Sequence, residues 1–261
     1  MKNQVVEQPK SYDFPTEVIT LPSKGKLYPP DNPLSSGTVE MRYMTAKHED
    51  ILTNESYIKS GVVIDKLLET LVVSRVNLND ILIGDKNALL VAARILGYGK
   101  DYTFKFQPVL SDEIEEVTID LAELSDKELD ESLLVDGQNR FEFTTPISKK
   151  LIEFKLLTQG DEKKIDGEVK SIKKLYKKES PEASVRLKHT ITSVDGNSDP
   201  KVIRDFIDNH LLAREARELR HYINKVSPDV DLTFDYEGDG YTEDGVSVPL
   251  GISFFWPDAG A

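Results

Sequence analysis

Strand-like and helix-like patterns follow one another in the same order in the two halves of this 261-residue chain. In the first half, alternation of apolar and polar residues predicts strands at 18–21 and 39–44. Apolar residues at helical spacing then predict helices at 62–73 and 85–96. A second pair of strands is expected within 102–121. Short elements in this mixed order favour an α+β fold.

The second half contains segments that resemble these elements in sequence. A charged helix is expected over 162–179, and Pro200 is expected to open a helix that contains residues 202–207. The four matches are 141–146 with 19–22, 152–158 with 39–45, 208–219 with 85–96, and 232–236 with 102–106. Four matches in one order indicate an internal duplication.

We therefore expect two related units from an internal duplication, each with β-hairpins that flank a helical segment. The first unit is predicted to span 14–135 and the second 140–261, with a linker at 136–139. Residues 1–13 are polar and are expected to form a flexible N-terminal arm. Two copies are too few for a solenoid, so we expect the units to pack on each other.

Composition excludes several classes of protein. The chain has 33 basic and 46 acidic residues, for a net charge of −13, which disfavours binding to nucleic acid. It has no cysteine, so disulfides, thiolate metal sites and cysteine catalysis are absent. The polar N-terminus is not a signal peptide, and no apolar run could span a membrane. We expect a soluble protein of a cytoplasm.

The motifs of common enzymes are missing, so we expect no enzyme activity, no cofactor and no metal. The nearest candidate for a metal site is the acidic segment 235–244. Asp235, Glu237, Asp239 and Gly240 imitate the start of a calcium-binding loop, but Val246 stands where a bidentate Glu is required. A solvated hairpin tip is the favoured interpretation, and a divalent-metal site or an unrecognised enzyme centre is the alternative.

Lysines of the expected helix at 162–179 form one candidate surface for a partner. Apolar residues interleave with them, which is typical of an amphipathic helix with a solvated basic face. A dock for an acidic protein is the functional alternative. The candidate partner-binding residues of this helix are Lys170, Lys173, Lys174 and Lys177.

Three adjacent aromatic residues near the C-terminus form the other candidate surface. Phe254, Phe255 and Trp256 follow the last expected hairpin, and a strand here would place a ring on each of its faces. They could anchor another subunit, or they could be covered by their own domain.

As a set, several segments resemble the T-even-type bacteriophage baseplate family. The segments are 19–25, 44–53, 82–99 and 254–257, and the resemblance extends over about residues 16–257. Residues 84–99 are the most specific part. Many relatives carry Cys-x-x-Cys pairs in the two late hairpins that suggest zinc ribbons. This chain has residues 107–111 and 237–240 there, so no such zinc site carries over.

The resemblance implies a protein of the contractile-tail baseplate hub. Such a protein is either built into the baseplate as a structural subunit or needed as a factor for its assembly. It would act through contacts with other baseplate and hub proteins, without nucleic acid or membrane. We would expect it in the host cytoplasm during virion morphogenesis, and in the tail baseplate if it is a permanent subunit.

Overall fold

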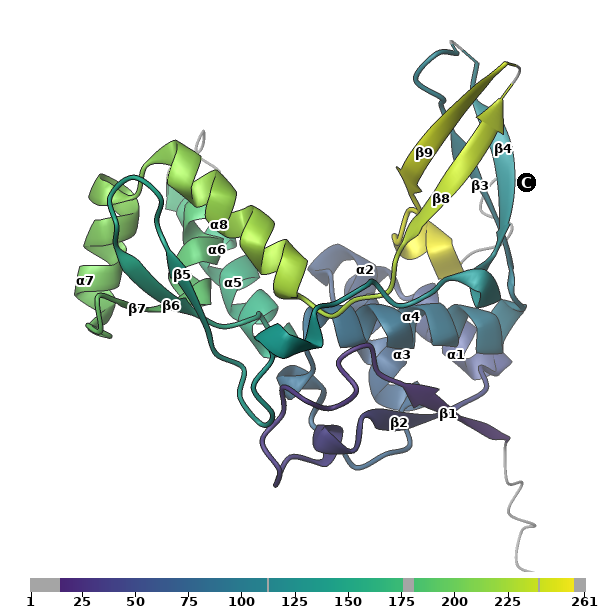
Figure 1. The fold of residues 1–261 in the computed structure, drawn as a ribbon. Helices are drawn as coiled ribbons and strands as arrows, with labels where there is room; N and C mark the ends of the chain where they lie inside the picture. Colours follow the sequence, from purple (N-terminus) through teal and green to yellow (C-terminus); the bar gives the residue numbers. More distant parts are fainter. Residues whose placement is uncertain (1–14, 112, 176–180, 239, 256–261) are drawn as a thin grey trace, which may run out of the picture.

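The computed structural model describes residues 15–111, 113–175, 181–238 and 240–255. Within these ranges, eight α-helices accompany four small antiparallel sheets, which confirms the expected α+β class. Figure 1 shows two helical lobes and, above one of them, a projecting pair of hairpins. The predicted N-terminal arm lies outside this part of the chain.

The N-terminal half is a hairpin followed by helices. Strands β1 and β2 are antiparallel, with Val18 opposite Glu40. The elements are β1 (Thr16–Thr20), β2 (Thr38–Arg42), α1 (Ala46–Leu52), α2 (Glu55–Ser60), α3 (Val63–Leu71) and α4 (Ile83–Tyr98). The strands and the helices α3 and α4 confirm the predictions, whereas α2 was not foreseen.

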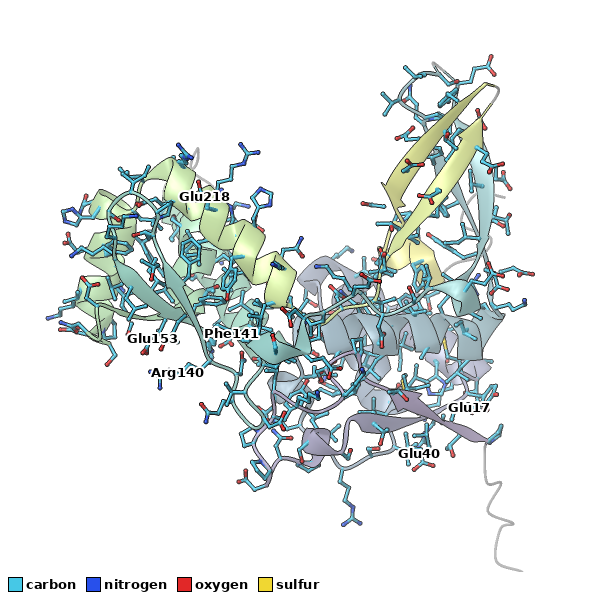
Figure 2. The ribbon with its side chains drawn as sticks, in the orientation of Figure 1. Glu17, Glu40, Arg140, Phe141, Glu153 and Glu218 are labelled. Carbon is cyan, nitrogen blue, oxygen red and sulfur yellow. The ribbon has the colours of Figure 1, made fainter. Side chains whose placement is uncertain are left out.

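The C-terminal half forms the other lobe. Its sheet has the order β5-β6-β7, and helices pack beside it (Figure 1). The elements are β5 (Phe141–Thr144), β6 (Leu151–Phe154), α5 (Gln159–Leu175), α6 (Glu182–Thr190), β7 (Ile191–Val194), α7 (Pro200–Asp205) and α8 (Ala213–Val226). Figure 2 labels Arg140 and Glu153, which form an ion pair between the residue before β5 and the central strand β6. Helix α6 and strand β7 were not foreseen.

A pair of hairpins, one from each half, projects from the N-terminal lobe. The strands are β3 (Asp101–Phe106), β4 (Glu115–Asp120), β8 (Thr233–Gly238) and β9 (Tyr241–Ser247). We call residues 101–120 and 233–247 the double hairpin. The two hairpins lie side by side in Figure 1 although their sequences are far apart. The boundary expected at residues 136–139 therefore divides the sequence into two halves, but hairpins from both halves lie together in space.

Short helical turns connect these elements. The 3-10 turns are Pro33–Ser36, Leu78–Asp80, Leu121–Glu123, Glu131–Leu133 and Ile252–Phe255, and Phe206–His210 is a π-helical turn.

The π-helical turn corrects one sequence match. Residues 208–219 were expected to align with the helix at 85–96. Because Asp208 belongs to the π-helical turn, α8 begins only at Ala213. Glu215 is the third residue of α8, as Asp85 is the third residue of α4.

Two further correspondences between the halves lie in the backbone. Thr45 and Thr158 each precede a helix, and the N–H of each donates to a side chain three residues on, His48 at 2.9 Å and Asp161 at 3.3 Å. This is the geometry of a capping box. In addition, a segment that follows a helix returns to each hairpin: Val72 bridges Met41 of β2, and β7 pairs with β6.

One hydrophobic core extends through both halves. Leu67, Leu68 and Leu71 of α3 are fully buried in it, as their spacing on one helix face requires. Phe154 of β6 and Leu219 of α8 belong to the same core. Helices α5 and α6 enclose a second small cluster around Ile165 and Val185. Because the main core is shared, the free energy of folding of each half includes contacts with the other.

Candidate functional site

Aromatic side chains between the two hairpins give the double hairpin a packed interior. Alternation places Phe104 and Phe106 of β3 on one face, and they contact Phe234 of β8 at ring-centroid distances of 5.5 and 5.8 Å. Phe106 also meets Tyr236 edge to face at 5.0 Å. Pairs in this geometry contribute about 0.5–1.5 kcal/mol each beyond area burial. The double hairpin is therefore a small sandwich of two hairpins.

Two polar contacts also join the hairpins. The hydroxyl of Tyr236 donates to Glu115 at 2.5 Å, and this contact with a carboxylate raises the pKa of the tyrosine. Near the tip, the Val109 N–H donates to Glu243 at 3.0 Å. Each contact links residues more than a hundred positions apart, so they fix the two hairpins relative to each other.

The tip of the double hairpin exposes apolar side chains. Val109, Leu110 and Ile114 in the β3–β4 loop are 78%, 73% and 67% exposed. Clustered exposed aliphatic residues on a projecting element are typical of a protein interaction site. Sequence reasoning identified residues 107–111 only as a hairpin tip. Val109 and Leu110 directly after Pro108, in a loop where turns usually carry polar residues, were the signal it missed.

The flank of the double hairpin is acidic. A groove of about 790 Å³ runs between β4 and β8. No basic residue of the described chain lines it, and its acidic lining residues are Glu115, Glu116, Asp120, Glu123, Asp235 and Glu237. The field of such a groove attracts a basic surface and repels phosphate groups.

The acidic segment 235–244 lies within the second of these hairpins, as the favoured interpretation expected. The carboxylate of Asp235 accepts from the Gly245 N–H at 2.9 Å, while Glu243 is bonded to Val109. These carboxylates therefore fix backbone positions rather than converge on one point. Among the described residues, which omit Asp239, no group of three acidic or histidine side chains could hold a metal ion.

The prediction of an aromatic docking surface at the C-terminus is wrong for Phe254 and Phe255. Both are 1% exposed, and Ile252–Phe255 is a 3-10 turn rather than a strand. Phe254 meets Tyr102 edge to face at 4.8 Å, so it anchors the base of the double hairpin. The aromatic residues are buried because the turn folds them onto α4 and β3 rather than away from them. Trp256 lies outside the described residues.

The predicted lysine surface lies on the C-terminal half of α5. Lys170, Lys173 and Lys174 are exposed, and their spacing of three and four residues places them on one side of the helix. None of them forms an ion pair with another described residue, whereas Lys163 and Lys164 pair with Asp65 and Asp161. Lys177 lies outside the described residues.

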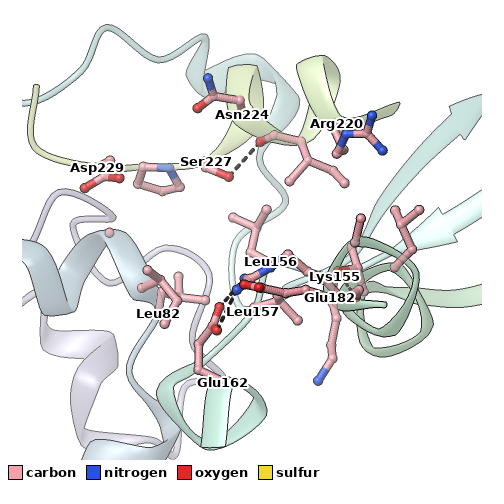
Figure 3. Close-up of a pocket in the computed structure, with 18 residues that line it drawn as sticks. Leu82, Lys155, Leu156, Leu157, Glu162, Glu182, Arg220, Asn224, Ser227 and Asp229 are labelled. Atoms are coloured by element: carbon pink, nitrogen blue, oxygen red, sulfur yellow. Dashed lines mark hydrogen bonds and ion pairs between the residues drawn. The ribbon is translucent and has the colours of Figure 1, made fainter. Parts of the chain in front are cut away.

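A cavity of about 680 Å³ lies where the two lobes meet (Figure 3). The N-terminus of α4, the end of β6 and the C-terminal part of α8 contribute to its wall. Its charged lining residues are three basic and three acidic: Lys155, Arg186, Arg220, Glu162, Glu182 and Asp229. Arg186 forms an ion pair with Glu162. The formal charges of its lining residues therefore sum to zero.

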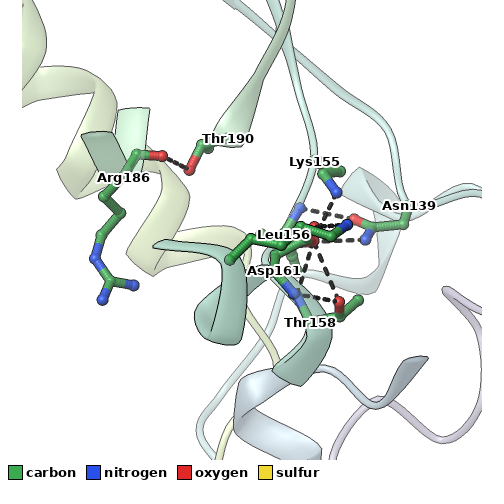
Figure 4. A network of polar contacts seen from close by, with 8 residues as sticks. Asn139, Lys155, Leu156, Thr158, Asp161, Arg186 and Thr190 are labelled. Atoms are coloured by element: carbon green, nitrogen blue, oxygen red, sulfur yellow. Dashed lines mark hydrogen bonds and ion pairs between the residues drawn. The ribbon is translucent and has the colours of Figure 1, made fainter. Parts of the chain in front are cut away.

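Hydrogen bonds beside the cavity fix the segment predicted as a linker, residues 136–139. The Asn139 side chain exchanges two bonds of 2.8 Å with the backbone of Leu156 (Figure 4). Gly137 N–H donates to the carbonyl of Lys26 at 2.6 Å. Nearby, Lys155 contacts Asp161 at 2.6 Å. Burial opposes ionisation of Asp161, but this lysine and Thr158 hold the pKa of the carboxyl below its ordinary value.

Two buried acids support tight turns at the start of each half. Asp85 accepts from the Ser23 N–H at 2.9 Å, from its hydroxyl at 2.7 Å and from Tyr28 at 2.5 Å. Glu215 accepts from the N–H groups of Ile147 and Ser148 at 3.0 and 2.7 Å. Both acids are hydrogen-bonded within the fold, as buried polar groups usually are.

No helix in the described ranges is long and apolar enough to cross a membrane. Comparison of the chain with protein-family models, with curated proteins and with solved structures gave no match.

Proposed function

We propose that this chain is a non-enzymatic component of a bacteriophage contractile-tail baseplate hub, acting through protein–protein contacts as a structural subunit or an assembly factor. Its resemblance to the T-even-type family in residues 84–99 and the surrounding segments supports the phage assignment. The observation that carries the interaction role is the double hairpin, a stiff projection with exposed apolar residues at its tip and acidic groups on its flank.

The chemistry of the double hairpin suits docking better than catalysis. An apolar centre with a polar rim is the usual organisation of a protein interface. The internal aromatic contacts join the two hairpins into one body before it binds, which lowers the entropy lost on association. The carboxylates on its inner side are engaged in hydrogen bonds across the hairpins.

We also infer that the two halves arose by internal duplication. In support, each half has a hairpin, a threonine-capped helix, a segment that returns to the hairpin, a helix with a buried acid at its third position, and a final hairpin. Fusion of two copies would explain why one hairpin from each half meets in the double hairpin.

The experiment that tests the role is a mass-spectrometric inventory of finished phage particles and of infected-cell lysate. Fixed copy number in the particle would identify a structural subunit. Abundance in the lysate with absence from the particle, together with co-purification of named baseplate proteins, would identify an assembly factor. If the chain is absent from particles and co-purifies with no baseplate protein, the proposal fails.

A variant links this test to the double hairpin. Replacing Val109, Leu110 and Ile114 with serine should abolish co-purification of baseplate proteins while the chain stays folded. The matched control replaces Val135, Ile147 and Val202, which are exposed elsewhere, and should retain it. Equal recovery with both variants would remove the tip from the proposal.

A further inference from the structure

We propose that copies of this chain associate head to tail, with the double hairpin of one copy docked on the lysine side of α5 in the next. This inference rests on the proposed role of the double hairpin as a docking element, and it names the partner as a second copy of the chain. The contact is carried by charge complementarity between two surfaces of one molecule.

The double hairpin supplies the acidic surface. Its two segments contain six and five acidic residues and a single basic one, Lys105. Glu113, Glu116 and Glu237 are exposed and make no side-chain hydrogen bond or ion pair with another described residue. These three side chains are therefore accessible to a partner that approaches the projection.

The C-terminal half of α5 supplies the basic surface. Residues 169–175 contain three lysines and no acid, in a chain whose net charge is −13. Lysines in a last turn interact favourably with the helix dipole, which accounts for Lys173 and Lys174. Lys170 lies a turn earlier. The three exposed ammonium groups together form a local positive field on an otherwise acidic molecule.

Each charged surface also has exposed apolar area next to it. Leu175, at the end of the described helix, is 76% exposed and lies about 100° around the helix from Lys174, so it borders the lysine side. Exposed ion pairs contribute only about 0.2–1 kcal/mol each, so burial of apolar side chains must add to them. Contact of Leu175 with the Val109–Leu110 tip would provide that burial.

The two surfaces belong to different parts of the molecule. The double hairpin projects above the N-terminal lobe, whereas α5 lies in the other lobe (Figure 1). No hydrogen bond or ion pair joins them among the residues described. Contact between unlike surfaces on two copies is heterologous, so it builds a ring where the rotation closes and an open chain of copies where it does not.

Sedimentation equilibrium of the full chain over a range of concentrations provides the test. The first variant, Lys170→Glu, Lys173→Glu and Lys174→Glu, should weaken self-association by at least about tenfold. The second, Glu113→Lys, Glu116→Lys and Glu237→Lys, should do the same. A control that reverses exposed Lys47, Lys201 and Lys225 should associate like the unmodified chain, and circular dichroism should show all of them folded.

Mixing the two variants is the decisive step. Each variant alone opposes like charges, but the acidic α5 of the first complements the basic double hairpin of the second, and the remaining surfaces also match. The mixture should therefore recover the association of the unmodified chain. Failure of the mixture to recover, or unchanged association of either variant, overturns the inference.

The same measurement separates this inference from the proposed function. A chain that stays monomeric at all concentrations but co-purifies with baseplate proteins overturns self-association and leaves the proposed function in place. A chain that associates as described but is absent from particles and baseplate complexes supports self-association and overturns the proposed function.

Discussion

Asp85 and Glu215 occupy the same position in their helices, and each accepts hydrogen bonds from a turn of its own half. Each is the third residue of its helix, is fully buried, and accepts hydrogen bonds from a serine in a turn after the first strand, Ser23 or Ser148. The residue after each serine is a lysine with positive φ, 50° at Lys24 and 57° at Lys149. A buried acid therefore holds an unusual turn against a helix N-terminus, where negative charge is favoured.

Removal of either acid should destabilise the fold. Asp85→Ala and Glu215→Ala each leave several donors without an acceptor, and we expect each to lower the free energy of unfolding by about 3 kcal/mol. Urea denaturation followed by circular dichroism measures this. The control is Glu128→Ala, at an exposed acid without a side-chain contact, which should change stability by less than about 0.5 kcal/mol. Equal effects at all three positions would contradict the assigned role.

The two acids should differ in their dependence on pH. Burial raises the pKa of Asp85 above its ordinary 3.8, and the hydrogen bonds from Tyr28 and Ser23 only partly offset it. Burial also opposes ionisation of Glu215, but hydrogen bonds from Ser148 and Ile147 outweigh it, so the pKa of Glu215 lies below 4.5.

The sign follows from proton linkage. The free energy of unfolding of the unmodified chain, relative to that of the Asp85→Asn variant, should fall as pH rises from 3.8 through the raised pKa of Asp85. The reason is that the folded chain binds this proton more tightly than the unfolded chain does. Stability relative to Glu215→Gln should instead be fully present above pH 4.5 and be lost as pH falls through the lowered pKa. Urea titrations from about pH 3 to 7 measure both differences, and slopes of the same sign would refute the assignment.

Two helix glycines should respond oppositely to alanine. A Cβ at Gly84 would lie 1.8 Å from the Pro228 carbonyl oxygen, so Gly84→Ala should destabilise the chain by more than about 1 kcal/mol. A Cβ at Gly167 in α5 meets nothing within 4 Å, so Gly167→Ala should stabilise it by about 0.5–1 kcal/mol. Thermal unfolding of both variants checks this, and a stabilising Gly84→Ala would show that the helix and the 228–229 backbone can separate.

The base and the tip of the double hairpin should differ in their effect on stability. Phe254 is buried against Tyr102, and Phe254→Ala should cost about 3–5 kcal/mol through the cavity it leaves. Leu110→Ala at the exposed tip should change stability by less than about 0.5 kcal/mol. Denaturation of both variants measures the contrast. If Phe254→Ala is as stable as the unmodified chain, Phe254 is not a core residue, and the aromatic residues are again candidates for a docking surface.

The sequence was most informative where periodicity is local. Apolar residues at helical spacing predicted α3 and α4, and β3 and β4 confirm the pair of strands expected within 102–121. It was less informative where tertiary contacts decide whether a segment forms a strand or where a helix begins. Strand β7 has only four residues and is a strand because β6 provides its partner, and the π-helical turn before α8 shifts the helix away from its sequence match.

The candidate surfaces show the same limit. Residue type alone could not distinguish an exposed aromatic anchor from a buried one, because burial of Phe254 depends on Tyr102, far away in the chain. The position of the lysines of α5 was easier to predict, since helical spacing alone places Lys170 and Lys174 on one side of the helix. The apolar tip was missed because a loop has no periodicity from which exposure can be inferred.

The double hairpin also orders events during synthesis. Its first hairpin leaves the ribosome with Phe104 and Phe106 uncovered, and their partner Phe234 follows only after the entire second lobe has been translated. A chain that stops before β9 cannot complete the projection. The projection can therefore form only after translation has passed β9, and a product that stops earlier would be excluded from any assembly that recognises the projection.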